Sequence, residues 1–85
     1  MMDDLTLYDL RPGEKASVSG MDIRGSMRRR LRDVGFLDGA EVVCAFRARS
    51  GEPAAFFVCG ALIALREEEM RAITATGRAA CTAWR

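Results

Sequence analysis

A single stretch, Ser26 to Gly39, contains the pattern of a whole helix together with both of its ends. Ser26 is a good N-cap, because its hydroxyl can accept a hydrogen bond from a backbone N–H of the first turn. Gly35 suits the left-handed position that follows a helix, and Phe36 can then fold back onto the helix's apolar side. Residues at i, i+4 and i+7 form that side: Met27, Leu31 and Val34. We therefore expect a short helix whose apolar underside covers one end of a small fold.

The upper surface of this predicted helix is rich in arginine. Arg28 and Arg29 fall in its predicted first turn, where the positive end of the helix dipole makes each cost roughly 0.3–1 kcal/mol. A role other than helix stability would explain them, so we take Arg28, Arg29 and Arg32 as candidate partner-binding residues. The competing interpretation is a solvated helix face whose arginines form ion pairs with the acidic run Glu67–Glu69.

Most of the remaining chain has the short, alternating pattern of β-strands. The predicted strands are Lys15–Met21, Glu41–Arg47, Ala54–Cys59, Leu62–Arg66 and Arg71–Ala75, with a tight turn at Gly60-Ala61. Thr6–Leu10 predicts a short N-terminal helical turn, and Glu67–Met70 predicts an acidic turn, helical or 3₁₀. About five short strands cannot stack as two full sheets, so the expected fold is a mainly β, strongly bent barrel. We expect one domain over residues 1–75 and a loosely ordered tail over 76–85.

The strand alternation separates inward from outward side chains. In Glu41–Arg47 the predicted inward residues are Val42, Cys44 and Phe46, and in the next strand they are Phe56 and Val58. Phe57 and Cys59 then face outward. An outward aromatic residue on a small barrel suggests a surface that another molecule covers, so Phe57 and Cys59 join the candidate partner-binding residues. Two other arrangements would also cover Phe57: the tail folding back through Trp84, or a homodimer through the same patch.

Composition excludes several classes of function. The 85 residues carry 13 basic and 12 acidic side chains, a net charge of +1 that does not indicate a nucleic-acid or membrane partner. Histidine is absent, which removes the commonest general base, and we expect no enzyme activity. The longest apolar run, Ala54–Leu65, is shorter than the about 20 residues of a transmembrane helix, so we expect no membrane insertion. Asp3 and Asp4 stand where a signal peptide would be basic.

The three cysteines are the only soft metal ligands. Their odd number and their spacing match neither a disulfide framework nor a CxxC site, which favours a reducing cytoplasm. Cys44 is predicted to face the core and Cys59 to face away from it, so the two thiols cannot hold one ion. We expect no cofactor, because the sequence supplies no ligand set for iron or another divalent metal.

An ordered set of motifs resembles the FeoA family, the small proteins associated with the ferrous-iron transporter FeoB. The motifs are Leu7-x-x-Leu10-x-x-Gly13-Glu14, Arg28-Arg29-Arg30-Leu31-x-Asp33-x-Gly35-x-x-x-Gly39, Gly51-Glu52-Pro53, Leu65-Arg66-x-Glu68-Glu69 and Ile73. The resemblance covers about Leu5 to Ala75. It implies an SH3-like barrel and a cytoplasmic accessory or regulator of bacterial ferrous-iron uptake. The chain departs from the family at Phe57 and Cys59, where polar or basic residues are usual.

The resemblance and the residues together favour a protein that works by binding. The expected partner is the cytoplasmic region of a FeoB-type transporter, contacted by Arg28, Arg29 and Arg32 and by the surface around Phe57. Transition metal ion binding would follow from the resemblance alone. The alternative is a nucleic-acid-binding or general interaction module, since small barrels also bind RNA and DNA. The near-neutral charge and the lack of aromatic residues among the arginines argue against nucleic acid.

Overall fold

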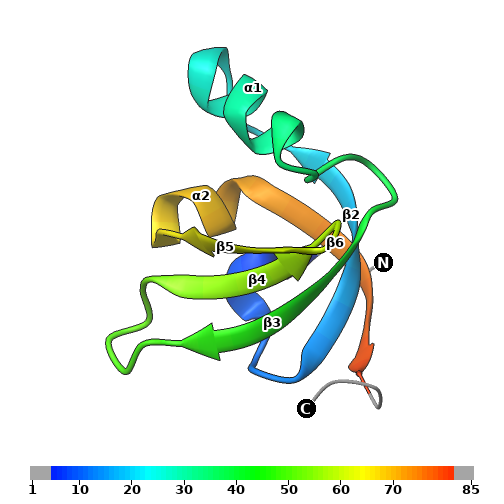
Figure 1. Cartoon of the computed structure of the whole chain (residues 1–85), viewed down its shortest axis with the longest axis vertical. Coiled ribbons are helices and arrows are strands. Elements are labelled where there is room, and N and C mark those ends of the chain that lie inside the picture. The colour runs from blue at the N-terminus through cyan, green and yellow to red at the C-terminus, as the bar shows by residue number, and fades with distance from the viewer. Residues whose placement is uncertain (1–4, 82–85) are drawn as a thin grey trace.

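The computed structural model describes residues 5–81, which form one bent antiparallel sheet and two α-helices (Figure 1). The elements are β1 (Leu5–Thr6), the 3₁₀ turn η1 (Leu7–Asp9), β2 (Glu14–Met21), α1 (Gly25–Asp33), β3 (Glu41–Arg47), β4 (Ala54–Val58), β5 (Ala61–Leu65), α2 (Glu67–Ala72) and β6 (Ile73–Ala80). The sheet has the order β1-β6-β2-β3-β4-β5. The mainly β prediction is confirmed, with six strands in place of about five and with the acidic turn lengthened into α2.

The core lies on the concave side of the sheet and is closed at one end by α1. Its largest fully buried side chains are Phe36, Phe56, Leu7, Leu10, Leu31, Leu65, Met70 and Ile73. Leu31 of α1 belongs to this core, and Met27 and Val34 pack against it. The predicted apolar underside of the helix is therefore confirmed, and α1 lies across the top of the sheet in Figure 1. Neither α1 nor α2, the α-helices of residues 5–81, has the length and apolarity to cross a bilayer.

The prediction for α1 is wrong at its N-terminal end and correct at its C-terminal end. The predicted cap at Ser26 is wrong, because the helix begins at Gly25 after the N-cap Arg24 and has no side-chain cap. The predicted C-terminal end is confirmed. Gly35 has φ +122°, its N–H donates to the Arg32 carbonyl, and the Phe36 N–H donates to the Leu31 carbonyl, each at 3.1 Å. These two bonds form the Schellman motif that ends many helices.

A bulge in β3 overturns the inward placement of Phe46. Cys44 pairs with Phe56, but Phe46 pairs with Ala55, so one extra residue enters β3 between these pairs. Such a bulge reverses the alternation that follows it. Val42 and Cys44 are fully buried as predicted, whereas the Phe46 side chain is 58% exposed on the outer side of the sheet.

The turn between β4 and β5 is displaced by one residue from the predicted Gly60-Ala61. Val58 pairs with Ala61, which leaves Cys59 and Gly60 as the two loop residues. Their φ values are +50° and +81°, the pattern of a type I′ hairpin turn. Cys59 therefore sits in the turn, one residue beyond the end of β4.

The last strand is longer than predicted. β6 runs to Ala80 and pairs with β2 through Ser17–Thr76 and Glu14–Ala80. The expectation of loose order is therefore wrong for residues 76–80, because the long β2 offers them a pairing edge. The Cys81 N–H also donates to the Gly13 carbonyl at 2.9 Å. Trp84, the alternative cover for Phe57, lies outside the described residues.

Candidate interaction surface

Two arginines of α1, Arg28 and Arg30, contact other parts of the fold through their guanidinium groups, whereas Arg29 and Arg32 are exposed. Arg28 is half-buried, and its Nη1 donates to the Met21 carbonyl at the end of β2 over 3.0 Å. It is the fourth helical residue, and Arg29 is the fifth, because α1 begins at Gly25. The dipole argument for an unexplained placement therefore weakens, since that effect fades beyond the first turn. Arg28 has a structural role that the sequence did not indicate: it ties α1 to the sheet.

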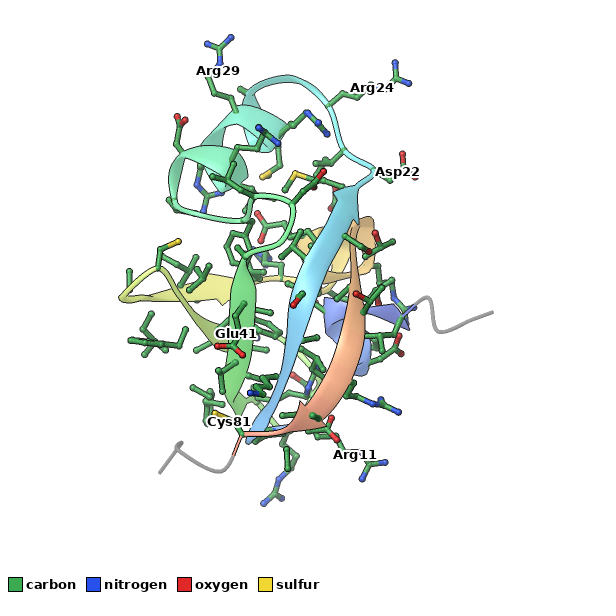
Figure 2. All side chains as sticks on the ribbon, turned by 90° about the vertical axis from the view of Figure 1, so that its right-hand side faces the viewer. Arg11, Asp22, Arg24, Arg29, Glu41 and Cys81 are labelled. Carbon is green, nitrogen blue, oxygen red and sulfur yellow. The ribbon has the colours of Figure 1, made fainter. Side chains whose placement is uncertain are left out.

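Arg29 and Arg32 are exposed and form the accessible part of the arginine surface. In Figure 2 the Arg29 side chain points away from the sheet at the top of the molecule, as does Arg24 at the start of α1. An open hollow runs along this side of the helix, and its lining consists of Gly25, Ser26, Arg28, Arg29, Arg32 and Asp33. The structure thus brings the three predicted arginines together on one side of α1, where guanidinium groups could meet carboxylates or phosphates.

The acidic run Glu67–Glu69 is less solvated than a charge run usually is. Glu69 is 6% exposed, and its Oε1 accepts the Arg66 N–H at the start of α2 over 2.8 Å. Its Oε2 lies 3.4 Å from Arg30 Nη1. Glu67 pairs instead with Arg71 at 2.7 Å, one helical turn along α2. The ion-pair interpretation of the arginines therefore applies to Arg30 and does not account for Arg29 or Arg32.

The outer side of β3, β4 and β5 carries a continuous apolar patch, which we call the apolar face. Register places its members side by side, because Phe57 pairs with Val43 and Leu62 while Ala55 pairs with Phe46 and Ala64. The apolar face therefore consists of Val43, Phe46, Ala55, Phe57, Leu62 and Ala64. Its large exposed side chains are Phe46 at 58%, Phe57 at 39% and Leu62 at 60%, whereas Val43, opposite Phe57, is buried. The outward position of Phe57 is confirmed, and sequence reasoning missed Phe46 and Leu62.

Cys59 lies where the β4–β5 turn meets the residue that follows α1. It is exposed in the β4–β5 turn, and its Sγ lies 3.7 Å from the Gly35 carbonyl just after α1. A Cβ atom on Gly35 would come within 2.8 Å of this sulfur, so the turn packs closely against the helix end. The hairpin tip that carries Cys59 thus joins the end of α1 to the sheet beneath it.

The structure keeps the two predicted thiols apart. Cys44 is fully buried, and burial raises the pKa of its thiol above the ordinary 9.0 although Arg47 lies near. Cys59 is exposed at the hairpin turn. Within residues 5–81 no three His, Cys, Asp or Glu side chains are grouped so that they could hold a metal ion.

Residues 5–76 match the family model described as the FeoA domain. The solution structure of the FeoA protein from Chlorobium tepidum has 30% sequence identity and a TM-score of 0.80, over 85% of this chain and 69% of that one. The zinc complex of FeoA from Stenotrophomonas maltophilia has 27% identity and a TM-score of 0.81, over 92% of this chain and 99% of that one. That protein is described as a prokaryotic SH3 domain protein with a suggested role as a ferrous iron transport activating factor.

A manganese-dependent transcriptional repressor shares the fold at 16% identity and a TM-score of 0.78, over 91% of this chain and 44% of that one. No curated protein matches the chain. The SH3-like fold expected from the sequence is therefore confirmed by solved structures of both short and longer chains.

Proposed function

The chain belongs to the FeoA domain family, and from this premise we propose that it is a cytoplasmic accessory protein of bacterial ferrous iron transport. It acts by binding the cytoplasmic region of a FeoB-type transporter and performs no catalysis of its own. The family match over residues 5–76 and the role suggested for the Stenotrophomonas maltophilia protein support the link to iron transport.

The observation that carries a binding role is the apolar face. Its six positions on three adjacent strands bear no charge, and three of its large side chains are at least 39% exposed. Contiguous exposed apolar surface of this kind marks interaction sites in small domains. Phenylalanine is among the residue types enriched at interfaces, where burying one aromatic side chain contributes about 1.5–3 kcal/mol.

The arginine surface supplies the second half of the proposed contact. Arg29 and Arg32 are exposed and lie on one side of α1, whose first turn contains no acidic residue. Asp33 is the acidic residue that lines the same hollow. Guanidinium groups in this setting attract an acidic patch on the partner and speed its approach. Arg28 lines the same hollow, although part of its hydrogen-bonding capacity is used by the Met21 carbonyl.

The test is capture of the isolated cytoplasmic region of the transporter by the full chain. Arg29→Ala with Arg32→Ala and, separately, Phe57→Ser should each reduce the captured amount at least tenfold. The matched control removes two exposed arginines elsewhere, Arg11→Ala with Arg49→Ala, and has the same change of net charge. Capture unchanged by both test variants, or reduced equally by the control, would overturn the proposed binding surfaces.

Nucleic-acid binding is the second candidate, because the hollow beside α1 is lined by three arginines. Against it, α1 contains no aromatic side chain on which a base could stack. A gel shift with mixed RNA and DNA decides the matter. A complex at low salt that is lost steeply as salt rises would support this candidate, and no complex at low salt would remove it.

A further inference from the structure

The strand β5 forms one edge of the sheet and lacks the features that protect an edge. Within residues 5–81 it pairs with β4 and with no other strand. Its sequence, Ala-Leu-Ile-Ala-Leu, contains no charge, no proline and no bulge. Exposed edges without these devices are templates for pairing with another strand. At the opposite edge, β1 is only two residues long and pairs with Thr74 and Ala75 of β6. The rest of that edge, residues 76–80 of β6, carries the charge of Arg78 and a break in register, which are features that protect an edge.

The side chains of β5 remain accessible on both sides of the strand. Leu62 is 60% exposed, Ala61 and Ala64 are exposed, and Ile63 is only partly buried although it faces the core. Leu65 alone is fully buried. In Figure 2 the β4–β5 hairpin projects from one side of the sheet. An approaching strand would therefore find exposed apolar side chains along most of β5.

The backbone of β5 also has free hydrogen-bonding groups in a definite pattern. Val58 and Ala61 close a two-residue hairpin, and such closing pairs exchange both of their backbone hydrogen bonds. Alternate residues along β5 therefore turn their N–H and C=O groups the other way. Leu62 and Ala64 direct these groups away from β4, toward the free edge.

We propose that β5 is the contact between two copies of this chain, paired antiparallel about a two-fold axis at Ile63. This register places Leu62 opposite the partner's Ala64, and Ala64 opposite the partner's Leu62. Each of these two pairs exchanges two backbone hydrogen bonds, so the interface has four. It also places Ala61 opposite the partner's Leu65. Every large aliphatic residue off the axis thus meets a small one, which lets the two strands approach without crowding. The pattern is self-complementary, as an isologous interface requires.

The charges along β5 are compatible with a second copy of the chain, and the small contact area limits the strength of the dimer. No like charges meet in the ladder, because Ala61–Leu65 is neutral and Arg66 falls beyond it, opposite the partner's Gly60. The contact is small, since a five-residue strand is about 17 Å long and buries less than the roughly 1,200 Å² of a standard stable interface. The dimer is therefore weak and concentration-dependent. It places the two apolar faces in one surface, because Leu62 and Ala64 belong to both the face and the edge.

The experiment measures molar mass by light scattering and sedimentation from low-micromolar to millimolar concentration. The monomer mass is 9.3 kDa, and the wild-type mass should rise toward twice this value. Ala64→Pro removes an N–H that faces the free edge and should weaken dimerisation at least tenfold, because proline is tolerated on the outer side of an edge strand. Ala64→Ser keeps this N–H and is the matched control. Leu62→Lys brings like charges near the axis and provides a second variant with an intact backbone.

Amide exchange by NMR checks the register independently of any variant. Protection of the Leu62 and Ala64 amides should rise with protein concentration in the wild type. A monomer at millimolar concentration, or a dimer unchanged in both Ala64→Pro and Leu62→Lys, would overturn the proposal. So would protection of these amides that appears only when the transporter's cytoplasmic region is added, since this would assign the edge to that partner. None of these results depends on the transporter-binding test, so the two proposals can fail separately.

Discussion

The guanidinium of Arg30 on α1 lies 3.4 Å from the carboxylate of Glu69 on α2, so one ion pair joins the two helices across the end of the core. The Glu69 side chain is 8% exposed and the Arg30 side chain 56%. Glu69 also accepts the Arg66 N–H at the start of α2. The buried member of the pair therefore has two structural roles, whereas Arg30 remains largely in solvent.

This asymmetry predicts unequal effects of the two deletions. Glu69→Ala should lower the free energy of unfolding by about 2 kcal/mol, because it removes a helix cap as well as the ion pair. Arg30→Ala should cost less than about 1 kcal/mol, since solvent screens an exposed partner. Urea unfolding measures both values, and Glu69→Gln, which keeps an acceptor for the Arg66 N–H, should fall between them. Equal losses in Arg30→Ala and Glu69→Ala would contradict the assignment.

A second prediction separates Arg28 from its neighbours. Arg28→Ala should lower the free energy of unfolding by about 1–2 kcal/mol, because the Met21 carbonyl loses its charged donor. Arg29→Ala and Arg32→Ala should each stay within about 0.5 kcal/mol of the wild type, as exposed substitutions usually do. Chemical unfolding of the three single variants tests this order. If Arg29→Ala proved as costly as Arg28→Ala, the division of the arginine surface would be wrong.

A third prediction concerns Arg47, whose guanidinium holds η1 and the β3–β4 loop together. It donates to the carbonyls of Tyr8 at 2.9 Å, Leu10 at 2.8 Å and Gly51 at 2.9 Å, and its Cζ lies 5.0 Å from the centre of the Tyr8 ring. Arg47→Lys should cost about 2–3 kcal/mol, because an ammonium group cannot reach three carbonyls in a fork. Thermal and urea unfolding measure the loss.

The matched control for Arg47 is Arg49→Lys, two residues along and exposed. It should change the free energy of unfolding by less than about 0.5 kcal/mol. If Arg47→Lys were as stable as the wild type, the carbonyls of Tyr8, Leu10 and Gly51 would not need the guanidinium as a hydrogen-bond donor.

A fourth prediction concerns the pH dependence of stability and reactivity at Cys44. Burial raises the pKa of this thiol above 9.0, so the folded protein holds the proton more tightly than the unfolded chain does. Titration of Cys44 should add no pH dependence to the free energy of unfolding well below pH 9.0. The free energy of unfolding should then fall as the pH rises from about 9.0 through the raised folded-state pKa, because the unfolded chain loses this proton first. Urea titrations across this range, with Cys44→Ala as the comparison, measure the effect.

The same burial predicts how the cysteines react. In the folded protein an alkylating reagent should modify Cys59, while Cys44 should react only after unfolding. Mass spectrometry of digested samples locates the modified residue. Rapid modification of Cys44 at neutral pH without unfolding would contradict its place in the core.

The mainly β class, the approximate positions of the strands before α2 and the C-terminal end of α1 could be predicted because they depend on neighbouring residues. The predicted last strand, Arg71–Ala75, began two residues too early, because Arg71 and Ala72 belong to α2. Met27, Leu31 and Val34 show the helix face through their spacing alone, and Gly35 and Phe36 mark where it ends. The outward position of Phe57 likewise follows from the alternation in β4. Two predictions failed for local reasons of another kind: one extra residue in β3 turned Phe46 outward, and the two-residue turn at Cys59 displaced the hairpin by one position. The prediction for residues 76–80 failed for a non-local reason, because these residues pair with β2.

The sequence by itself determined the periodic features, because apolar spacing and turn residues act over a few neighbouring positions. Only the tertiary structure decided which arginines are available for a partner. Arg28 is engaged by Met21, seven positions away, and Arg30 by Glu69, 39 positions away, and no local pattern encodes such contacts. It also assembled the apolar face and left β5 as an open edge, since both depend on the register between strands. The candidate surfaces could therefore be located from the sequence, but their composition required the packed fold.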